Sequence, residues 1–345
     1  MYYFCLCYQA LTNLNWNRLT VMSDVKYNSF ENKIMALMVS LLFAIFFITV
    51  NWESVFGNQF EDRHVYYFIF QGKPDYDIEF NKETFFFFLF NEQLWNKGVR
   101  WLNVSVGLSL DEIFGGVTFL IALSYSYFVA VRVGLAAVPL IINPIFIDLA
   151  CSQLRMAAAM VLLLLAFNTR IRILALIFVC AAFFIHTASF LFCFIVFVVH
   201  FVIKWSEKYN FQNIVSCTLL VITGAIVAIA VGPLRVWILE FFGDRRVNYD
   251  VDASTWSYAS IWVFLLGMAY FQRREFFRDY SNAIAVTFLS VFVFCTAFSV
   301  YGLRFLSAAL PFIFVALFRF GTVERPLVIL IFLAFSIVQW IYWVR

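Results

Sequence analysis

Long apolar runs alternate with short polar segments along most of the chain, from Ile34 to Val344. A helix of about 20 apolar residues crosses the roughly 30 Å hydrocarbon layer of a bilayer. The pattern therefore predicts an all-α fold, a polytopic transmembrane helical bundle of about 11 spans. The expected spans are 34–51, 113–131, 134–149, 154–167, two within 173–203, 214–236, 257–271, 283–300, 305–318 and 327–344.

The longest apolar run, Ile173 to Ile203, contains 31 residues. As a single helix it would measure roughly 46 Å, too long for a perpendicular crossing. We expect two helices that meet at a turn around His186–Ser189 on the outer side. A single tilted helix is the alternative, but it would place Arg273 and Arg274 outside, which the charge rule disfavours.

The polar segments lie within one polytopic membrane domain, residues 1–345. Two of them form large outer loops, residues 52–112 and 237–256. Within the first, residues 92–104 space their apolar side chains as an amphipathic helix does. This helix is expected either to lie on the outer leaflet or to form part of an ordinary soluble cap. Its apolar positions are Leu94, Trp95, Val99, Trp101 and Leu102.

One set of short loops carries most of the basic residues. Cytoplasmic loops collect Lys and Arg, so we expect this set and the N-terminus to lie inside. The set is Arg18, Lys26, Lys33, Arg132, Arg170, Arg172, Lys204, Lys208, Arg273, Arg274, Arg278, Arg319 and Arg325.

The opposite short loops also contain basic residues, and the orientation rule does not explain them. All of these are arginine. A guanidinium group matches two phosphate oxygens at once, so we expect an anionic ligand at the outer face. The residues are Arg155, Arg235, Arg245, Arg246 and Arg304.

The composition excludes several other classes of protein. A formal net charge of +3 with scattered basic residues gives no basis for nucleic-acid binding. The chain has three histidines and neither a CxxC nor an HExxH motif, so neither a metal site nor a cofactor is expected. Charged residues are scarce in the middle of the spans, which argues against an ion-coupled transporter.

Two arginines are candidate pyrophosphate ligands. Arg155 is expected at the outer N-terminal end of a helix, where free N–H groups also favour anions. Its structural alternatives are a salt bridge to Asp148 or a side chain that extends to the interface. Arg304 follows Tyr301 in a tight turn between two apolar segments.

His186 lies at the expected break of the long apolar run, and it is a candidate pyrophosphate ligand or general base. Its structural alternative is a hydrogen bond to Thr187 or Ser189. The outer loop adds candidate sugar-binding groups, Asp75, Tyr76 and Asp77, for which ordinary solvation is the alternative.

Four short motifs follow one another between about residues 51 and 320. They are Pro74-Asp75-Tyr76-Asp77 with Glu83, then Gln153-Leu154-Arg155, then His186-Thr187-Ala188-Ser189, and last Tyr301-Gly302-Leu303-Arg304. In this order they resemble the EpsG-like branch of bacterial O-antigen and capsule polymerases (Wzy-type). The sequence departs from the pattern of that family at Thr84, at Met156 and in the wider spacing of His186 and Ser189.

The resemblance implies a metal-independent glycosyltransferase in the bacterial inner membrane. Such enzymes join undecaprenyl-pyrophosphate-linked oligosaccharide repeat units, donor and acceptor, at the periplasmic face, and a chain-length regulator protein is a possible partner. The implied catalytic residues are Arg155, Arg304 and His186. The implied substrate-binding residues are Arg235, Arg245, Arg246, Asp75, Tyr76, Asp77 and Tyr301. The alternatives are a flippase or transporter of lipid-linked sugars and a membrane acyltransferase.

Overall fold

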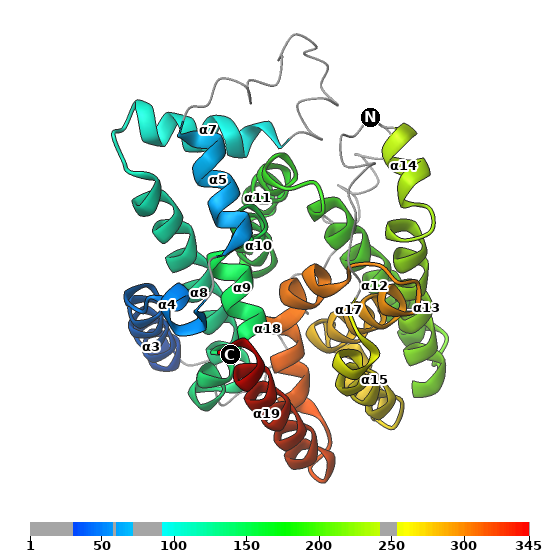
Figure 1. Ribbon diagram of the computed structural model, residues 1–345. Helices are drawn as coiled ribbons and strands as arrows, with labels where there is room; N and C mark the ends of the chain where they lie inside the picture. Colours follow the sequence, from blue (N-terminus) through cyan, green and yellow to red (C-terminus); the bar gives the residue numbers. More distant parts are fainter. Residues whose placement is uncertain (1–29, 58–59, 72–91, 242–253, 345) are drawn as a thin grey trace. The chain divides into compact units, whose positions relative to one another are not determined.

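The computed structural model describes residues 30–57, 60–71, 92–241 and 254–344 (Figure 1). Helices make up 84% of the structure, and the described residues contain no strand. The predicted all-α fold is therefore confirmed for this part of the chain. The chain consists of two compact units. The first unit is formed by Ser29–Phe190 with Gln339–Arg345, and the second contains Leu191–Val338.

Among the described residues, six helices are long and apolar enough to cross a membrane. A seventh span results if α9 (Pro144–Cys151) and α10 (Leu154–Asn168), bent by 100°, are taken together. These helices are typical of a membrane-embedded protein, but the predicted count of about 11 spans is not confirmed. The six are α3 (Phe30–Thr49), α8 (Leu110–Val133), α12 (Ser189–Lys208), α13 (Asn213–Val231), α17 (Tyr280–Ala297) and α19 (Glu324–Trp343).

The segment expected to cross at residues 134–149 forms two short helices. A 3-10 helix, η3 (Leu135–Ile141), contains Pro139, and Pro144 is the first residue of α9. Proline lacks the N–H group that a helix interior needs, so the two prolines prevent one continuous helix. The Asn143 side chain then caps α9 by accepting a hydrogen bond from the N–H of Phe146 (3.0 Å).

Small side chains set the packing in the first unit, where α3 contacts α8, α8 contacts α10, and α10 contacts α11 (Arg172–Ile185). Ala157 and Ala159 of α10 and Ala182 of α11 are fully buried. Alanines at such positions allow two helix backbones to approach closely. A capping box at Ser109 and Glu112 fixes the start of α8.

The predicted amphipathic helix is confirmed as α7 (Gln93–Val104). Its inner face places Trp95 and Val99 in a cluster with Tyr66 of α5 (Glu61–Phe70) and Phe114 of α8. On the opposite face Trp101 keeps 59% of its surface exposed. The buried face is what a cap requires, and the exposed tryptophan is what an interfacial helix requires.

The long apolar run divides as predicted. Helix α11 ends at Ile185, and α12 begins at Ser189. His186 forms the C-cap of α11 in an extended conformation (φ −149°), which interrupts the helical hydrogen bonds.

In the second unit α17 is buried along most of its length and packs against α13 and α18 (Leu303–Arg319). This unit also contains α14 (Arg235–Phe241), α15 (Trp256–Tyr270) and α16 (Arg274–Arg278), together with most of α12 and α19. Gly224 of α13 permits the close crossing, because an added Cβ would lie 2.6 Å from the Ser290 Cβ. The Ser290 hydroxyl donates across this contact to the Val221 carbonyl (2.8 Å).

Candidate functional site

A buried carboxylate, that of Glu92, organises the polar centre of the first unit. Glu92 is the N-cap of α7 and has a left-handed backbone conformation (φ 56°, ψ 41°). Only 2% of its surface is exposed. A buried carboxylate is costly unless charged or hydrogen-bonding groups surround it, so its partners decide what it does.

Groups from two other segments contact the Glu92 carboxylate. The Arg155 guanidinium forms an ion pair with Oε2. The His186 Nδ1 lies 2.7 Å from Oε1, and the backbone N–H of Thr187 donates to the same oxygen at 3.4 Å. The carboxylate therefore brings together an arginine and a histidine that are far apart in the sequence.

Arg155 is the second residue of α10, directly after the 100° bend from α9. Its Nε donates to the Tyr66 hydroxyl (2.8 Å), and its Cζ lies 5.2 Å from the centre of the Tyr66 ring. Its side chain remains 26% exposed, whereas that of Glu92 is 3% exposed. The guanidinium is thus held by a carboxylate and a phenol but keeps an accessible surface.

Tyr66 remains a neutral phenol at physiological pH. Burial raises the pKa of its hydroxyl, and Arg155 lowers that pKa to a smaller extent. A raised pKa in the folded state means that this contribution to stability is present below pH of about 10 and is lost as the pH rises further. At neutral pH the hydroxyl therefore accepts the hydrogen bond from Arg155 Nε without charge.

His186 has a defined orientation. A carboxylate oxygen only accepts hydrogen bonds, so an ionised Glu92 requires the proton on His186 Nδ1. In a neutral imidazole this leaves Nε2 as the basic nitrogen. Carboxylate–histidine pairs of this kind orient a general base and stabilise its protonated form.

The cluster combines two chemical capacities. Arg155 can neutralise an anion, and His186 can take up a proton. With a neutral imidazole, Glu92 and Arg155 balance each other, and protonation of His186 adds one positive charge next to any anion that forms there. This arrangement suits a reaction in which a hydroxyl loses a proton while a phosphate group leaves.

Two buried glutamines lie next to the cluster in sequence. Within the described part of the chain, neither side-chain polar atom of Gln93 has a hydrogen-bond partner. The Gln153 Nε2 donates to Asp148 (2.6 Å), while its Oε1 is buried without a partner in the same residues. An unsatisfied buried polar group costs about 1–3 kcal/mol, so these amides are candidate ligand contacts.

The observed contacts of Arg155 and His186 differ from the salt bridge to Asp148 and from the hydrogen bonds to Thr187 or Ser189. Glu92 is the carboxylate that Arg155 contacts, whereas Asp148 accepts from Gln153. The Ser189 hydroxyl donates to the Ala182 carbonyl (3.2 Å). Arg155 and His186 thus share a partner that neither alternative included.

The other predicted site residues either belong to the second unit or lie outside the described residues. Arg304, Tyr301 and Arg235 belong to the second unit. There the Arg304 Cζ lies 5.6 Å from the centre of the Tyr301 ring, at the start of α18, and Arg235 is the first residue of α14. Other predicted residues lie outside the described part of the chain: Asp75, Tyr76, Asp77, Arg245 and Arg246, and also Glu83.

Glu92 and Tyr66 are the members of the cluster that the sequence interpretation missed. Glu92 was assigned only to the start of the amphipathic helix. A carboxylate placed directly before a helix that packs against the core is a usable signal, because burial of such a group requires a cationic partner.

No group of three or more His, Cys, Asp or Glu side chains with metal-binding geometry occurs among the described residues. The five cysteines in this part of the chain are free thiols. Comparison with protein-family models, with curated proteins and with solved structures gives no match.

Proposed function

We propose that this protein is a membrane glycosyltransferase that joins polyprenyl-pyrophosphate-linked oligosaccharide repeat units, as O-antigen polymerases do. The observation that carries the proposal is the Glu92 carboxylate, which holds Arg155 and His186 side by side. A cation and an oriented base are the two groups that transfer from a diphosphate to a hydroxyl requires.

Arg155 acts on the leaving group. The bond between the anomeric carbon of the donor and the diphosphate oxygen breaks, and its electron pair passes to the diphosphate. Negative charge grows there as the bond lengthens, so a fixed guanidinium stabilises the transition state more than the ground state. The exposed part of Arg155, at the N-terminus of α10, is where a diphosphate oxygen would bind.

His186 acts on the acceptor. The hydroxyl of the acceptor sugar attacks the anomeric carbon, and its proton passes to His186 Nε2. Glu92 then balances the imidazolium through Nδ1. The transition state resembles an oxocarbenium ion, and no metal is required in this scheme.

The other predicted residues have auxiliary roles in the proposal. Arg304, with Tyr301 beside it, would be a further phosphate ligand, and Arg235 would be a secondary contact. The substrates are undecaprenyl-pyrophosphate-linked oligosaccharides in the bacterial inner membrane, with the site at the periplasmic face, and a chain-length regulator is the expected protein partner.

A deletion strain complemented with variants tests the proposal. The surface glycan should be a ladder with the wild-type gene and a single repeat unit with Arg155→Lys or His186→Ala. Arg132→Lys is the matched control, because Arg132 stacks on Phe128 at the far end of α8 (4.5 Å). Complete loss of surface glycan in the deletion strain would indicate a flippase, and a full ladder with both site variants would contradict the assigned roles.

A further inference from the structure

A second polar site lies in the first unit, on the face of α5 that carries Arg63, His64 and Tyr67. It is a cavity of about 370 Å³ between the end of α3, α4 (Trp52–Phe56), α5, the first turns of α8, and Cys151 of α9. Small-molecule sites typically measure about 300–1,000 Å³, so the cavity is large enough for a small ligand.

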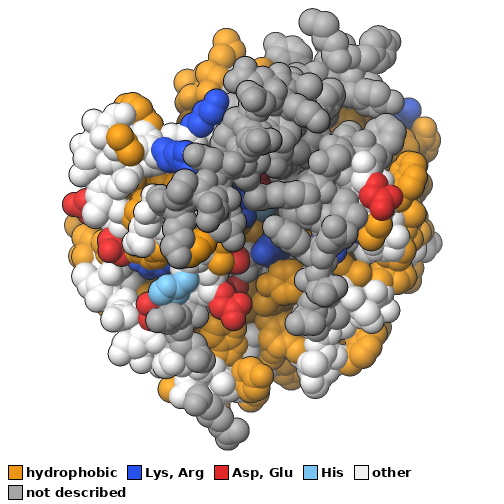
Figure 2. Space-filling model, turned by 45° about the horizontal axis from the view of Figure 1, so that its top comes forward, with side chains coloured by type: hydrophobic (Ala, Val, Ile, Leu, Met, Phe, Trp, Pro, Cys, Tyr) orange, Lys and Arg blue, Asp and Glu red, His pale blue; other side chains and the backbone are white. Residues whose placement is uncertain are grey.

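Two side-chain pairs line this cavity. The Arg63 guanidinium forms an ion pair with Asp111 (3.3 Å), and the His64 Nε2 lies 3.6 Å from a carboxylate oxygen of Glu53. Arg63 is the deeper group, with 22% of its side chain exposed, and Asp111 is at the rim with 77% exposed. The face in Figure 2 shows a histidine side chain with acidic and basic side chains beside it.

The charge balance of the cavity argues against an anionic ligand. The lining contains one arginine and two carboxylates, whose charges sum to −1. Phosphate would be repelled. Carboxylates that accept hydrogen bonds and a guanidinium that donates them suit hydroxyl groups, which do both.

Tyr66 and Tyr67 connect the two sites. Tyr66 contacts Arg155 in the Glu92 cluster, and the hydroxyl of Tyr67, which lines the cavity, donates to Asp111. Both rings pack against Phe114, at 6.1 and 5.2 Å between ring centres. Consecutive residues of one short helix therefore face the two sites.

We propose that this cavity binds one neutral sugar residue of the glycan, beside the Glu92 cluster where the glycosidic bond is formed. The inference rests on the proposed function, because the cavity then holds the saccharide while Arg155 holds the diphosphate. Asp111 and Glu53 accept from sugar hydroxyls, and Arg63 donates to them.

Two adjacent glycines of α8 provide a matched test. Gly115 lines the cavity, and Gly116 does not. An added Cβ at either position meets nothing within 4 Å, so both Gly115→Leu and Gly116→Leu should fold. Only the leucine at position 115 would fill the cavity.

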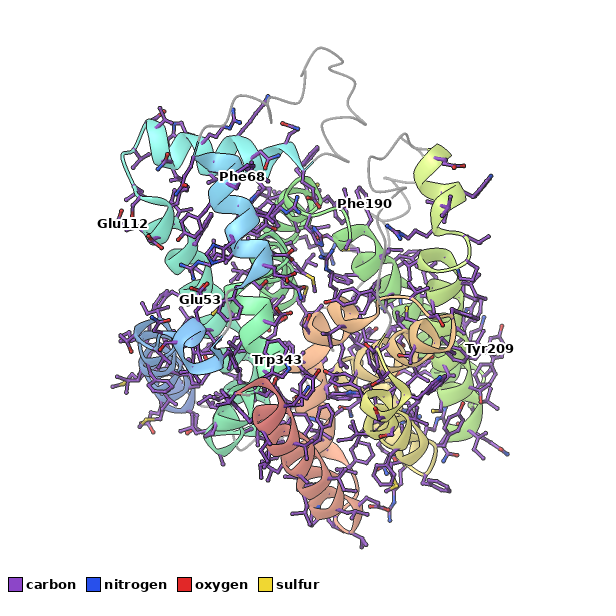
Figure 3. The ribbon with its side chains drawn as sticks, in the orientation of Figure 1. Glu53, Phe68, Glu112, Phe190, Tyr209 and Trp343 are labelled. Carbon is purple, nitrogen blue, oxygen red and sulfur yellow. The ribbon has the colours of Figure 1, made fainter. Side chains whose placement is uncertain are left out.

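Binding is measured with the full-length protein in lipid nanodiscs by saturation-transfer NMR. The probes are glucose, galactose, N-acetylglucosamine and rhamnose, each alone, with inorganic pyrophosphate followed separately by ³¹P NMR. At least one sugar should show transfer, and Gly115→Leu and Asp111→Asn should weaken it at least ten-fold. Gly116→Leu and Glu112→Gln should not. Glu112 is a good control, because it caps the first turn of the same helix and does not line the cavity. Figure 3 shows it apart from Glu53, which does line the cavity.

Three outcomes would overturn the proposal: no transfer to any sugar, equal transfer in both leucine variants, or pyrophosphate binding that Gly115→Leu abolishes. The measurement needs no turnover, so it is independent of the glycan ladder. Sugar binding at the cavity together with a full ladder in Arg155→Lys and His186→Ala would refute the roles of the Glu92 cluster but leave the sugar site standing.

Discussion

Replacement of Glu92 by glutamine should separate the two roles of the buried carboxylate. Glutamine has nearly the same shape, so the packing of α7 is preserved while one negative charge is lost. Arg155 then loses the carboxylate that contacts it, and His186 Nδ1 faces an amide that can present either a donor or an acceptor.

The expected loss of stability follows from the burial of the pair. Removal of one partner of a buried ion pair costs about 3–5 kcal/mol, because the other charge remains buried. The Arg155 side chain keeps 26% exposure, so we expect the lower end, about 3 kcal/mol. Each kcal/mol lowers Tm by roughly 2–4 °C in domains of this size, which gives a fall of about 6–12 °C.

The expected loss of activity is larger. A carboxylate that orients a general base contributes to proton transfer, and removal of that contribution slows turnover by about 10²–10⁴-fold. Glu92→Gln should therefore lower kcat strongly, with a smaller change in the KM for the lipid-linked donor.

Unfolding can be followed with a thiol-reactive dye in detergent, because Cys151, Cys217 and Cys295 are buried in the folded chain. Turnover is followed by the conversion of radiolabelled lipid-linked repeat units to longer glycan. The double variant Glu92→Gln/Arg155→Met removes both charges. It should recover most of the lost Tm and none of the activity.

The reasoning would be refuted by a Glu92→Gln variant with wild-type Tm and wild-type turnover. A variant that loses stability but keeps kcat would limit Glu92 to a structural ion pair. A double variant that is no more stable than Glu92→Gln would show that the unpaired charge of Arg155 is not the cause of the lost stability.

Substitutions at Arg155, Tyr66 and Gly224 test three other contacts of the protein. Arg155→Lys should reduce chain extension by at least ten-fold in the radiolabel assay while Arg132→Lys leaves it unchanged, because a point charge lacks the bidentate fork; equal activity of the two would argue against phosphate recognition. Tyr66→Phe should lower stability by about 1.5–3 kcal/mol through the lost hydrogen bond to Arg155, measured by the dye assay, and an unchanged Tm would show that this bond contributes little. Gly224→Val should destabilise the contact with Ser290, by about 1–3 kcal/mol, and equal Tm values would mean that the two helices move apart without cost.

The sequence predicted those features that depend on local pattern. The apolar runs predicted the long helices, and the spacing of apolar residues at 92–104 predicted α7. The length of the apolar run around His186 predicted the break between α11 and α12. The segment 134–149 was expected as a span interrupted by Pro139 and Pro144, and the structure divides it into η3 and α9, because proline prevents the helix from continuing.

The cluster itself could be predicted only in part. Arg155 and His186 were selected one at a time, each as an unusual residue in an apolar setting. Their meeting depends on Glu92, which is 63 residues before Arg155 and 94 before His186. Pairing across such separations is set by how α7, α10 and α11 pack, and a single sequence carries no record of which surfaces meet.

The left-handed backbone at Glu92 has a consequence for protein engineering. Glycine and asparagine adopt φ values near +56° more readily than glutamate does, by about 1 kcal/mol. A consensus or computational redesign that scores backbone preference alone would choose one of those residues at position 92. The resulting chain would have less backbone strain at position 92, but Arg155 would lose the carboxylate that contacts it. Thermostabilised versions of this protein should therefore keep that glutamate.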